Sequence, residues 1–161
     1  MIQPKHFNFK YLPDRSFVTV IKNSVGSKMF RSFLVEKNGK QFDVLKKGSL
    51  SCAYYASTIL KMFGLIDKMH FTVGKTVNDL IKCGAVKVNV KSLKPGDVLI
   101  WVSKNVSSGQ HNHIGFFIGN GNAVSNSESK KEITRHHVTF KGTRDIEVAF
   151  RPNWKRINAK S

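Results

Sequence analysis

The sequence predicts an α+β fold in which an early helix packs on a central antiparallel β-sheet. A helix-period pattern begins at Ser51, and a series of strand-like segments separated by tight turns follows from Val98. No internal repeat or linker divides the 161 residues, which is the usual size of one domain. We therefore expect a single domain, 1–161, with a core at residues 46–155 and a β-rich extension at 1–45.

The extension is predicted to contain an N-terminal β-hairpin. The segments SFVTVIKN and FRSFLVEKNGKQFDVL are rich in β-branched and aromatic residues, which favour strands. The second segment contains Asn38-Gly39, a dipeptide typical of a two-residue hairpin turn.

A helix is predicted to start at Cys52. Apolar residues recur at helical spacing and so share one face: Cys52, Ala56, Ile59, Leu60 and Phe63. Ser51 is a typical N-cap residue, and Gly64 is suited to end the helix.

A second, shorter helix is predicted over Val77–Cys83. Thr76 and Asp79 have the spacing of a capping box, and Gly84 follows as a C-terminal stop. Cys83 would then lie at the helix C-terminus, where the helix dipole does not activate a thiol.

Strands are predicted along the rest of the chain. Pro95-Gly96 forms a turn that leads into an apolar strand from Val98 to Val102. The later strand-like segments are HIGFFIG, NAVSNS after the Asn-Gly turn, EITRHHVTF, and RDIEVAFRP after the turn KGT.

Cys52 is the candidate nucleophile. In the first turn of a helix, unpaired backbone N–H groups and the positive end of the dipole favour the thiolate. The alternative is a buried cysteine that packs as a small apolar side chain. Because the chain has only one other cysteine, Cys83, we expect no disulfide framework.

His113 is the candidate base, because it opens an apolar strand at the end of a sheet and a cysteine nucleophile needs a base within hydrogen-bond reach. With a two-residue Asn-Gly turn, Gly115 pairs with Asn126, which places Asn126 diagonal to His113. An amide there could orient the imidazole. A register change of one residue would present Ser125 or Ser127 instead.

The order of three motifs, GSLSCAYYASTIL, LKPGDVLIW and HIGFFIGNGNAV, resembles the NlpC-type cell-wall cysteine peptidases over roughly residues 49–150. The related CHAP amidases are similar enough that the two cannot be separated. The resemblance implies a papain-like fold with Cys52 as nucleophile and His113 as base. It also implies a third polar residue, Asn126 or Ser125. Members of the family usually carry Asp at the position directly before the cysteine, where this chain has Ser51, and we expect Ser51 to lie near the oxyanion end of the site.

This resemblance implies hydrolysis of an amide bond in bacterial peptidoglycan stem peptides through a thioester intermediate. Two alternatives remain open at this point. One is an acyltransferase that uses the same scaffold and intermediate. The other is a non-catalytic basic module that binds nucleic acid or an anionic surface. We expect no cofactor.

The remaining histidines are expected to be structural or solvated. His136 and His137 would point to opposite faces of a strand, so at most one can reach the cleft. His111 is expected in a loop, and although it shares strand parity with His113, further ligands at suitable spacing are missing for a zinc site. Trp101 is expected in the core.

The chain is strongly basic, with 27 Lys and Arg against 10 Asp and Glu and a formal net charge of +17. This charge favours an anionic partner, and we expect peptidoglycan or another anionic cell-envelope polymer. Nucleic acid is less favoured, because the lysines are scattered and no nucleic-acid motif occurs.

The N-terminal segment MIQPKHFNFKYLPDRSF shows no apolar region of a signal peptide, and no transmembrane segment is predicted. We expect a cytoplasmic protein, or one delivered to the envelope by a phage particle or another signal-independent route. We expect a monomer unless the chain is part of an assembly such as a virion.

Overall fold

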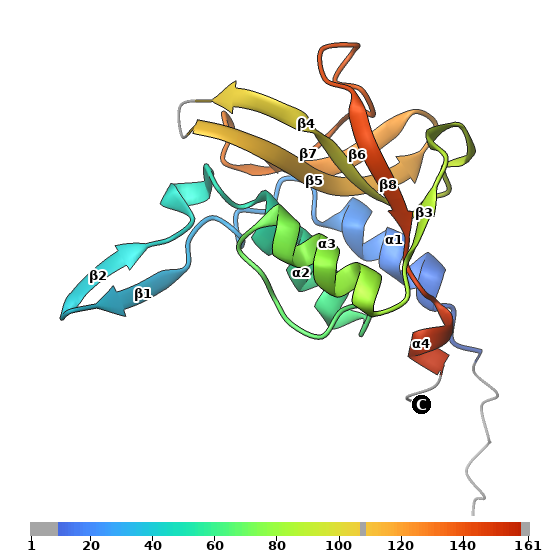
Figure 1. The fold of residues 1–161 in the computed structure, drawn as a ribbon, viewed down its shortest axis with the longest axis horizontal. Coiled ribbons are helices and arrows are strands. Elements are labelled where there is room, and N and C mark those ends of the chain that lie inside the picture. Colours follow the sequence, from blue (N-terminus) through green and yellow to red (C-terminus); the bar gives the residue numbers. More distant parts are fainter. Residues whose placement is uncertain (1–9, 107–108, 159–161) are drawn as a thin grey trace, which may run out of the picture.

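The structure is a computed structural model that describes residues 10–106 and 109–158. Within these residues, six antiparallel strands form the main sheet, and helices lie on one side of it (Figure 1). A two-stranded hairpin projects from this body (Figure 1). The predicted α+β class, with helices on an antiparallel sheet and an N-terminal hairpin, is confirmed. No helix in the described part of the chain is both long and apolar enough to span a membrane.

The first described element is a helix, α1 (Pro13–Asn23), in a segment predicted to be a strand. Pro13 suits the first helical turn, where its missing N–H needs no partner. Phe17 and Ile21 lie one helical turn apart and are both fully buried. The strand prediction is wrong, because burial of this helical face outweighs the strand preference of the β-branched residues.

The predicted hairpin is confirmed as β1 (Leu34–Lys37) and β2 (Lys40–Asp43). Asn38 and Gly39 at the turn have φ angles of 53° and 71°, as this type of two-residue turn requires. The Asp43 carboxylate closes the base of the hairpin by accepting hydrogen bonds from the backbone N–H groups of Phe33, Leu45 and Lys47. The hairpin is thereby tied to the segment that leads into the next helix.

Helix α2 (Cys52–Met62) starts at the predicted residue, and Gly64, with a φ of 68°, follows its end. Ser51 occupies the N-cap position, but its side chain makes no capping hydrogen bond. Its hydroxyl is fully buried and has no hydrogen-bond partner among the described residues. The capping role predicted for the Ser51 side chain is therefore wrong.

Helix α3 (Val73–Lys82) begins four residues before the predicted start. Thr72, not Thr76, is the N-cap, and its hydroxyl accepts a hydrogen bond from the N–H of Lys75. The end is as predicted, because Cys83 occupies the C-cap and Gly84 follows with a φ of 88°.

The main sheet has the strand order β3-β8-β4-β5-β6-β7. The bounds are β3 (Val86–Val88), β4 (Val98–Val106), β5 (Gly109–Gly119), β6 (Asn122–Ser127), β7 (Glu132–His137) and β8 (Ile146–Arg151), followed by a short helix, α4 (Lys155–Asn158). The predicted strands are confirmed in number and order, but β4 runs on to Val106 and β7 ends three residues early, and β3 is an addition. Because β5 begins at Gly109, His113 lies within its strand and does not open it as predicted. His111 lies in β5 and not in a loop, while its side chain lies outside the described part of the structure.

The two faces of the sheet pack differently. Ile114 and Phe116 of β5 face the helices, and the Phe116 ring meets Phe17 of α1 edge to face, with the ring centroids 5.3 Å apart. The opposite face carries a smaller cluster that includes Trp101 and Ala123. Since side chains alternate along a strand, His113 belongs to the second face.

Candidate active site

A cavity of about 690 Å³ lies where the start of α2 approaches β5. Cys52 and His113, the two residues predicted to react, both line it. Other lining residues come from distant parts of the chain and include Phe71, Asn126, Phe140 and Arg144. The fold therefore brings together two side chains that are 61 positions apart in the sequence.

The start of α2 directs the Cys52 thiol toward β5. Cys52 is partly buried, and its sulfur interacts with the backbone N–H of Ile114, the residue that follows His113. This contact places the thiol at the part of β5 that carries His113.

Burial raises the pKa of the Cys52 thiol above its usual value. The N–H groups of Ile114 and Ala53 and the positive charge of Arg144 lower this pKa but do not offset burial. The N–H groups at the start of the helix favour the thiolate as expected, but burial outweighs them. The resting thiol is neutral, and its proton must leave when the sulfur reacts.

Alkylation of Cys52 by iodoacetamide is expected to keep accelerating as the pH rises beyond the usual pKa of a thiol, because only the thiolate reacts and burial raises the pKa of Cys52. The rate is best measured by mass spectrometry on Cys83→Ser protein, which leaves Cys52 as the single thiol. A rate that is already maximal at mildly acidic pH would show a preformed thiolate and contradict this prediction.

His113 is hydrogen-bonded to Ser125, with 2.8 Å between Nε2 and Oγ. Gly119 pairs with Asn122 as predicted, but a bulge between Phe117 and Gly119 shifts the register so that Gly115 pairs with Ser125. The predicted pairing of Gly115 with Asn126 is wrong, and the serine lies beside the imidazole. A Cβ atom at Gly115 would lie 2.6 Å from the Ser125 Cβ, so the glycine makes room for this contact.

Asn126 points to a different partner. Its Nδ2 donates a hydrogen bond to the Gly48 carbonyl at 2.8 Å, and the side chain is almost fully buried. The amide therefore fixes the segment that precedes α2, while Ser125 is the hydrogen-bond partner that the described structure gives to the His113 ring. Ser51 is also absent from the residues that line the cavity within the described structure.

His136 extends the hydrogen-bonded network. Its Nε2 lies 2.8 Å from Ser125 Oγ, and its Nδ1 lies 2.8 Å from the backbone oxygen of His137. The His137 side chain is exposed and contacts Thr139 instead. The two histidines thus face opposite ways as predicted, but the sequence did not indicate that His136 joins the site.

The His113 imidazole is neutral at physiological pH. Burial lowers its pKa to about 3, with further contributions from the charges of Arg144 and His136. A neutral ring can accept a proton, as a general base must.

Arg144 is a second residue that the sequence did not single out. Its Nε donates to the Val102 carbonyl at 2.9 Å, and its charge acts on Cys52, His113 and His136. In a chain with 27 Lys and Arg, its position in a turn gave no signal of this role.

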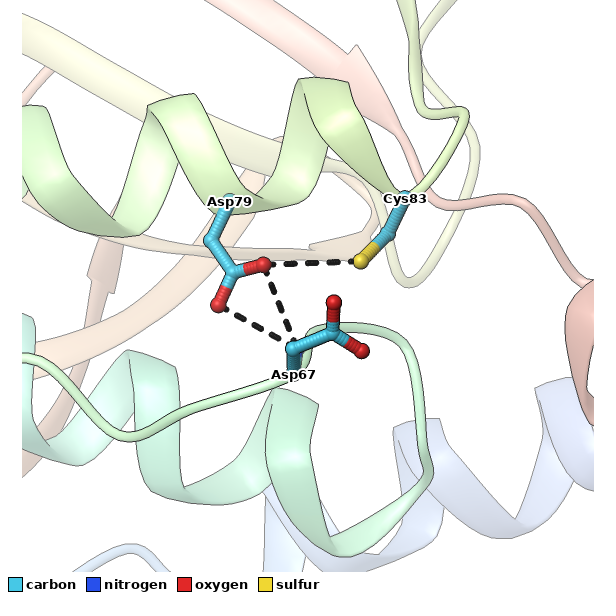
Figure 2. A group of neighbouring side chains, drawn as sticks. All are labelled: Asp67, Asp79 and Cys83. Atoms are coloured by element: carbon cyan, nitrogen blue, oxygen red, sulfur yellow. Dashed lines mark hydrogen bonds between the residues drawn. The ribbon is translucent and has the colours of Figure 1, made fainter.

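A separate cluster, Asp67, Asp79 and Cys83, brings three possible metal-ligand atoms within 4.8 Å of one another (Figure 2). Its groups already have hydrogen-bond partners. The Asp79 carboxylate accepts from the N–H groups of Asp67 and Lys68 and from the Cys83 thiol, and it pairs with His70 Nε2 at 2.8 Å. Asp67 pairs with Arg156. We therefore infer that the cluster stabilises the loop between α2 and α3.

Replacing Asp79 with asparagine is expected to lower the free energy of unfolding at pH 7 by about 2 kcal/mol. Burial raises the pKa of this carboxyl, but hydrogen bonds from His70 and the N–H groups of Lys68 and Asp67 outweigh burial and lower it to about 2. This stabilisation is present above the unfolded pKa near 3.8 and is lost as the pH falls through about 2.

Urea denaturation of the wild type and Asp79→Asn at pH 7 and near pH 2.5 measures this difference, which should shrink at the lower pH. Glu36→Gln, on the exposed hairpin, is the control and should change little. Equal stability of wild type and Asp79→Asn at pH 7 would contradict the anchoring role.

A family model described as bacteriophage peptidoglycan hydrolase matches residues 46–153 of the 161. The matched segment includes Cys52, His113 and Ser125 and leaves out α1 and the β1–β2 hairpin. No curated protein sequence matches the chain. Because the match covers well over half of its length, the chain belongs to the bacteriophage peptidoglycan hydrolase family and is a hydrolase.

Proposed function

We propose that the protein is a cysteine amidase or endopeptidase that cleaves an amide bond in peptidoglycan stem peptides. The observation that carries the proposal is the cavity lined by both Cys52 and His113, with His113 hydrogen-bonded to Ser125. A nucleophile, a base and a group that orients the base are the parts that thiol hydrolysis requires. In this proposal Ser125 takes the third role that the sequence left open between Asn126 and Ser125.

The first half of the reaction forms a thioester. His113 takes the proton of the Cys52 thiol as the sulfur attacks the amide carbonyl, and the carbonyl oxygen becomes negatively charged. The backbone N–H of Cys52, in the first turn of α2 where N–H groups have no intrahelical acceptor, and a neighbouring donor stabilise this oxyanion. His113 then gives its proton to the amine, and the C–N bond breaks.

The second half consumes water. Neutral His113 accepts a proton from a water molecule as the water oxygen attacks the thioester carbonyl. The C–S bond breaks, the sulfur regains a proton from His113, and the peptide leaves as a carboxylic acid. An amine or alcohol acceptor in place of water would make the same site an acyltransferase.

The charge of +17 supports an anionic polymer as the substrate environment, because peptidoglycan carboxylates and associated wall polymers are negative. We propose delivery to the wall by a phage particle or another signal-independent route. The phage character of the family supports this part of the proposal.

Digestion of purified peptidoglycan followed by mass spectrometry of the soluble products tests the proposal. Free stem peptides would identify an amidase, and peptide fragments with a new terminus inside the stem would identify an endopeptidase. Peptides joined to an added amine would instead identify an acyltransferase. Release of no peptide by the folded wild-type protein would overturn the proposal.

A further inference from the structure

We propose that His136 is a positioning residue that determines, through Ser125, which ring nitrogen of His113 accepts the proton of Cys52. The inference rests on the proposed roles of Cys52 and His113. It concerns a side chain that is not among the described residues lining the cavity and whose hydrogen-bonded link to His113 runs through Ser125.

The direction of each hydrogen bond follows from one backbone carbonyl. The oxygen of His137 can only accept, so Nδ1 of His136 carries a hydrogen. In a neutral imidazole the other nitrogen is then an acceptor, so the Ser125 hydroxyl donates to Nε2 of His136. The Ser125 oxygen in turn accepts from Nε2–H of His113. This leaves Nδ1 of His113 unprotonated and able to accept a proton.

The argument requires that both rings are neutral. Burial lowers the pKa of His136, and the charges of His137 and Arg144 lower it further, while the hydrogen bond to the His137 carbonyl raises it. The net direction is downward, as it is for His113. Neither ring therefore carries a second N–H at neutral pH to reverse the order of donors.

Packing holds the two rings in the required orientation. Phe140 stacks on His136 with the ring centroids 3.9 Å apart and the planes 17° apart. Trp101 contacts both imidazoles, at centroid distances of 5.4 Å to His113 and 5.5 Å to His136. The indole N–H is itself fixed by a 2.7 Å hydrogen bond to the Val138 carbonyl. Rotation of either ring would have to displace these aromatic neighbours.

The pairing of strands in the sheet brings the three side chains of the network, His113, Ser125 and His136, next to one another. Ser125 on β6 pairs with Gly115 on β5 and with Thr134 on β7. His113 and His136 each lie two residues from those partners and therefore on the same face. The three side chains form a diagonal line across β5, β6 and β7.

The first test uses the wild-type protein. Imidazole ¹⁵N chemical shifts at neutral pH report which nitrogen of each histidine is protonated. We expect the hydrogen on Nε2 in His113 and on Nδ1 in His136. A hydrogen on Nδ1 of His113 would overturn the inference, and this measurement needs neither turnover nor a variant.

The second test measures peptidoglycan hydrolysis by Ser125→Ala, His136→Phe and the double variant. We expect kcat of each single variant to fall by about 10- to 100-fold with little change in KM. This loss is smaller than the full contribution of general acid–base catalysis, about 10²- to 10⁴-fold, because His113 itself is still present. Because both act through one chain of hydrogen bonds, the double variant should be no slower than the slower single variant. Additive losses, or full activity in His136→Phe, would overturn the inference.

Two further variants separate positioning from structure. His136→Gln keeps an acceptor for the Ser125 hydroxyl and should recover part of the activity that His136→Phe loses. Arg135→Gln, an exposed neighbour on β7, is the control and should be unaffected. If the wild type releases no peptide, the proposed function fails, whereas the ¹⁵N shifts still decide the orientation of His113.

Discussion

Cys52→Ala is expected to reduce the release of peptides from peptidoglycan by at least about 10⁴-fold, because the thioester cannot form without the sulfur. The residual rate would come from direct attack by water on a substrate held in the same cavity. The fold should persist, since Cys52 is only partly buried and loses a single sulfur atom. Single-turnover release kinetics, followed by mass spectrometry, measure the loss.

Cys83→Ser is the matched control for the nucleophile. This second cysteine is buried beside Asp79, and serine keeps a donor for the Asp79 carboxylate. Its activity should equal that of the wild type below its unfolding temperature. A Cys52→Ala protein that retains more than a few per cent of the wild-type rate would exclude a thioester pathway.

His113→Gln is expected to lower kcat by about 10³- to 10⁴-fold, because no group then takes the thiol proton or protonates the amine. KM should change much less, since glutamine keeps a polar side chain of similar length in the cavity. His70→Gln is the control, as His70 pairs with Asp79 outside the cavity-lining residues. Loss of activity in both variants alike would indicate a general effect of removing a histidine.

The pH dependence of the wild type provides a second readout for His113. A base loses activity when it becomes protonated, and burial lowers the pKa of this imidazole from 6.5 to about 3. The acidic limb of kcat/KM for the wild type should therefore lie well below pH 6.5. An acidic limb near pH 6.5 would indicate a solvated histidine as the base.

Local signals in the sequence were sufficient for much of the fold. The start of α2 follows from the spacing of its apolar residues, and the Asn-Gly turns locate two hairpins. These elements are determined by neighbouring residues, so a single sequence contains the information. The same signals located Cys52 and His113, which the structure places on one cavity.

Features that depend on distant contacts could not be predicted. The segment of α1 has strand-forming residues and becomes a helix because Phe17 and Ile21 are buried against other elements. The bulge before Gly119 depends on how β5 and β6 pair, and it decides whether Ser125 or Asn126 meets His113. His136 reaches Ser125 only because β7 pairs with β6.

Helix α1 lies outside the matched residues 46–153. Its Phe17 ring nevertheless packs against Phe116 of β5, the strand that carries His113. A fragment cut at residue 46 would leave the underside of β5 open to water, at a cost of about 2 kcal/mol for each large apolar side chain left uncovered. The segment that matches the family model, residues 46–153, is therefore shorter than the segment expected to fold stably by itself. Work on an isolated piece of this enzyme should begin it ahead of Pro13.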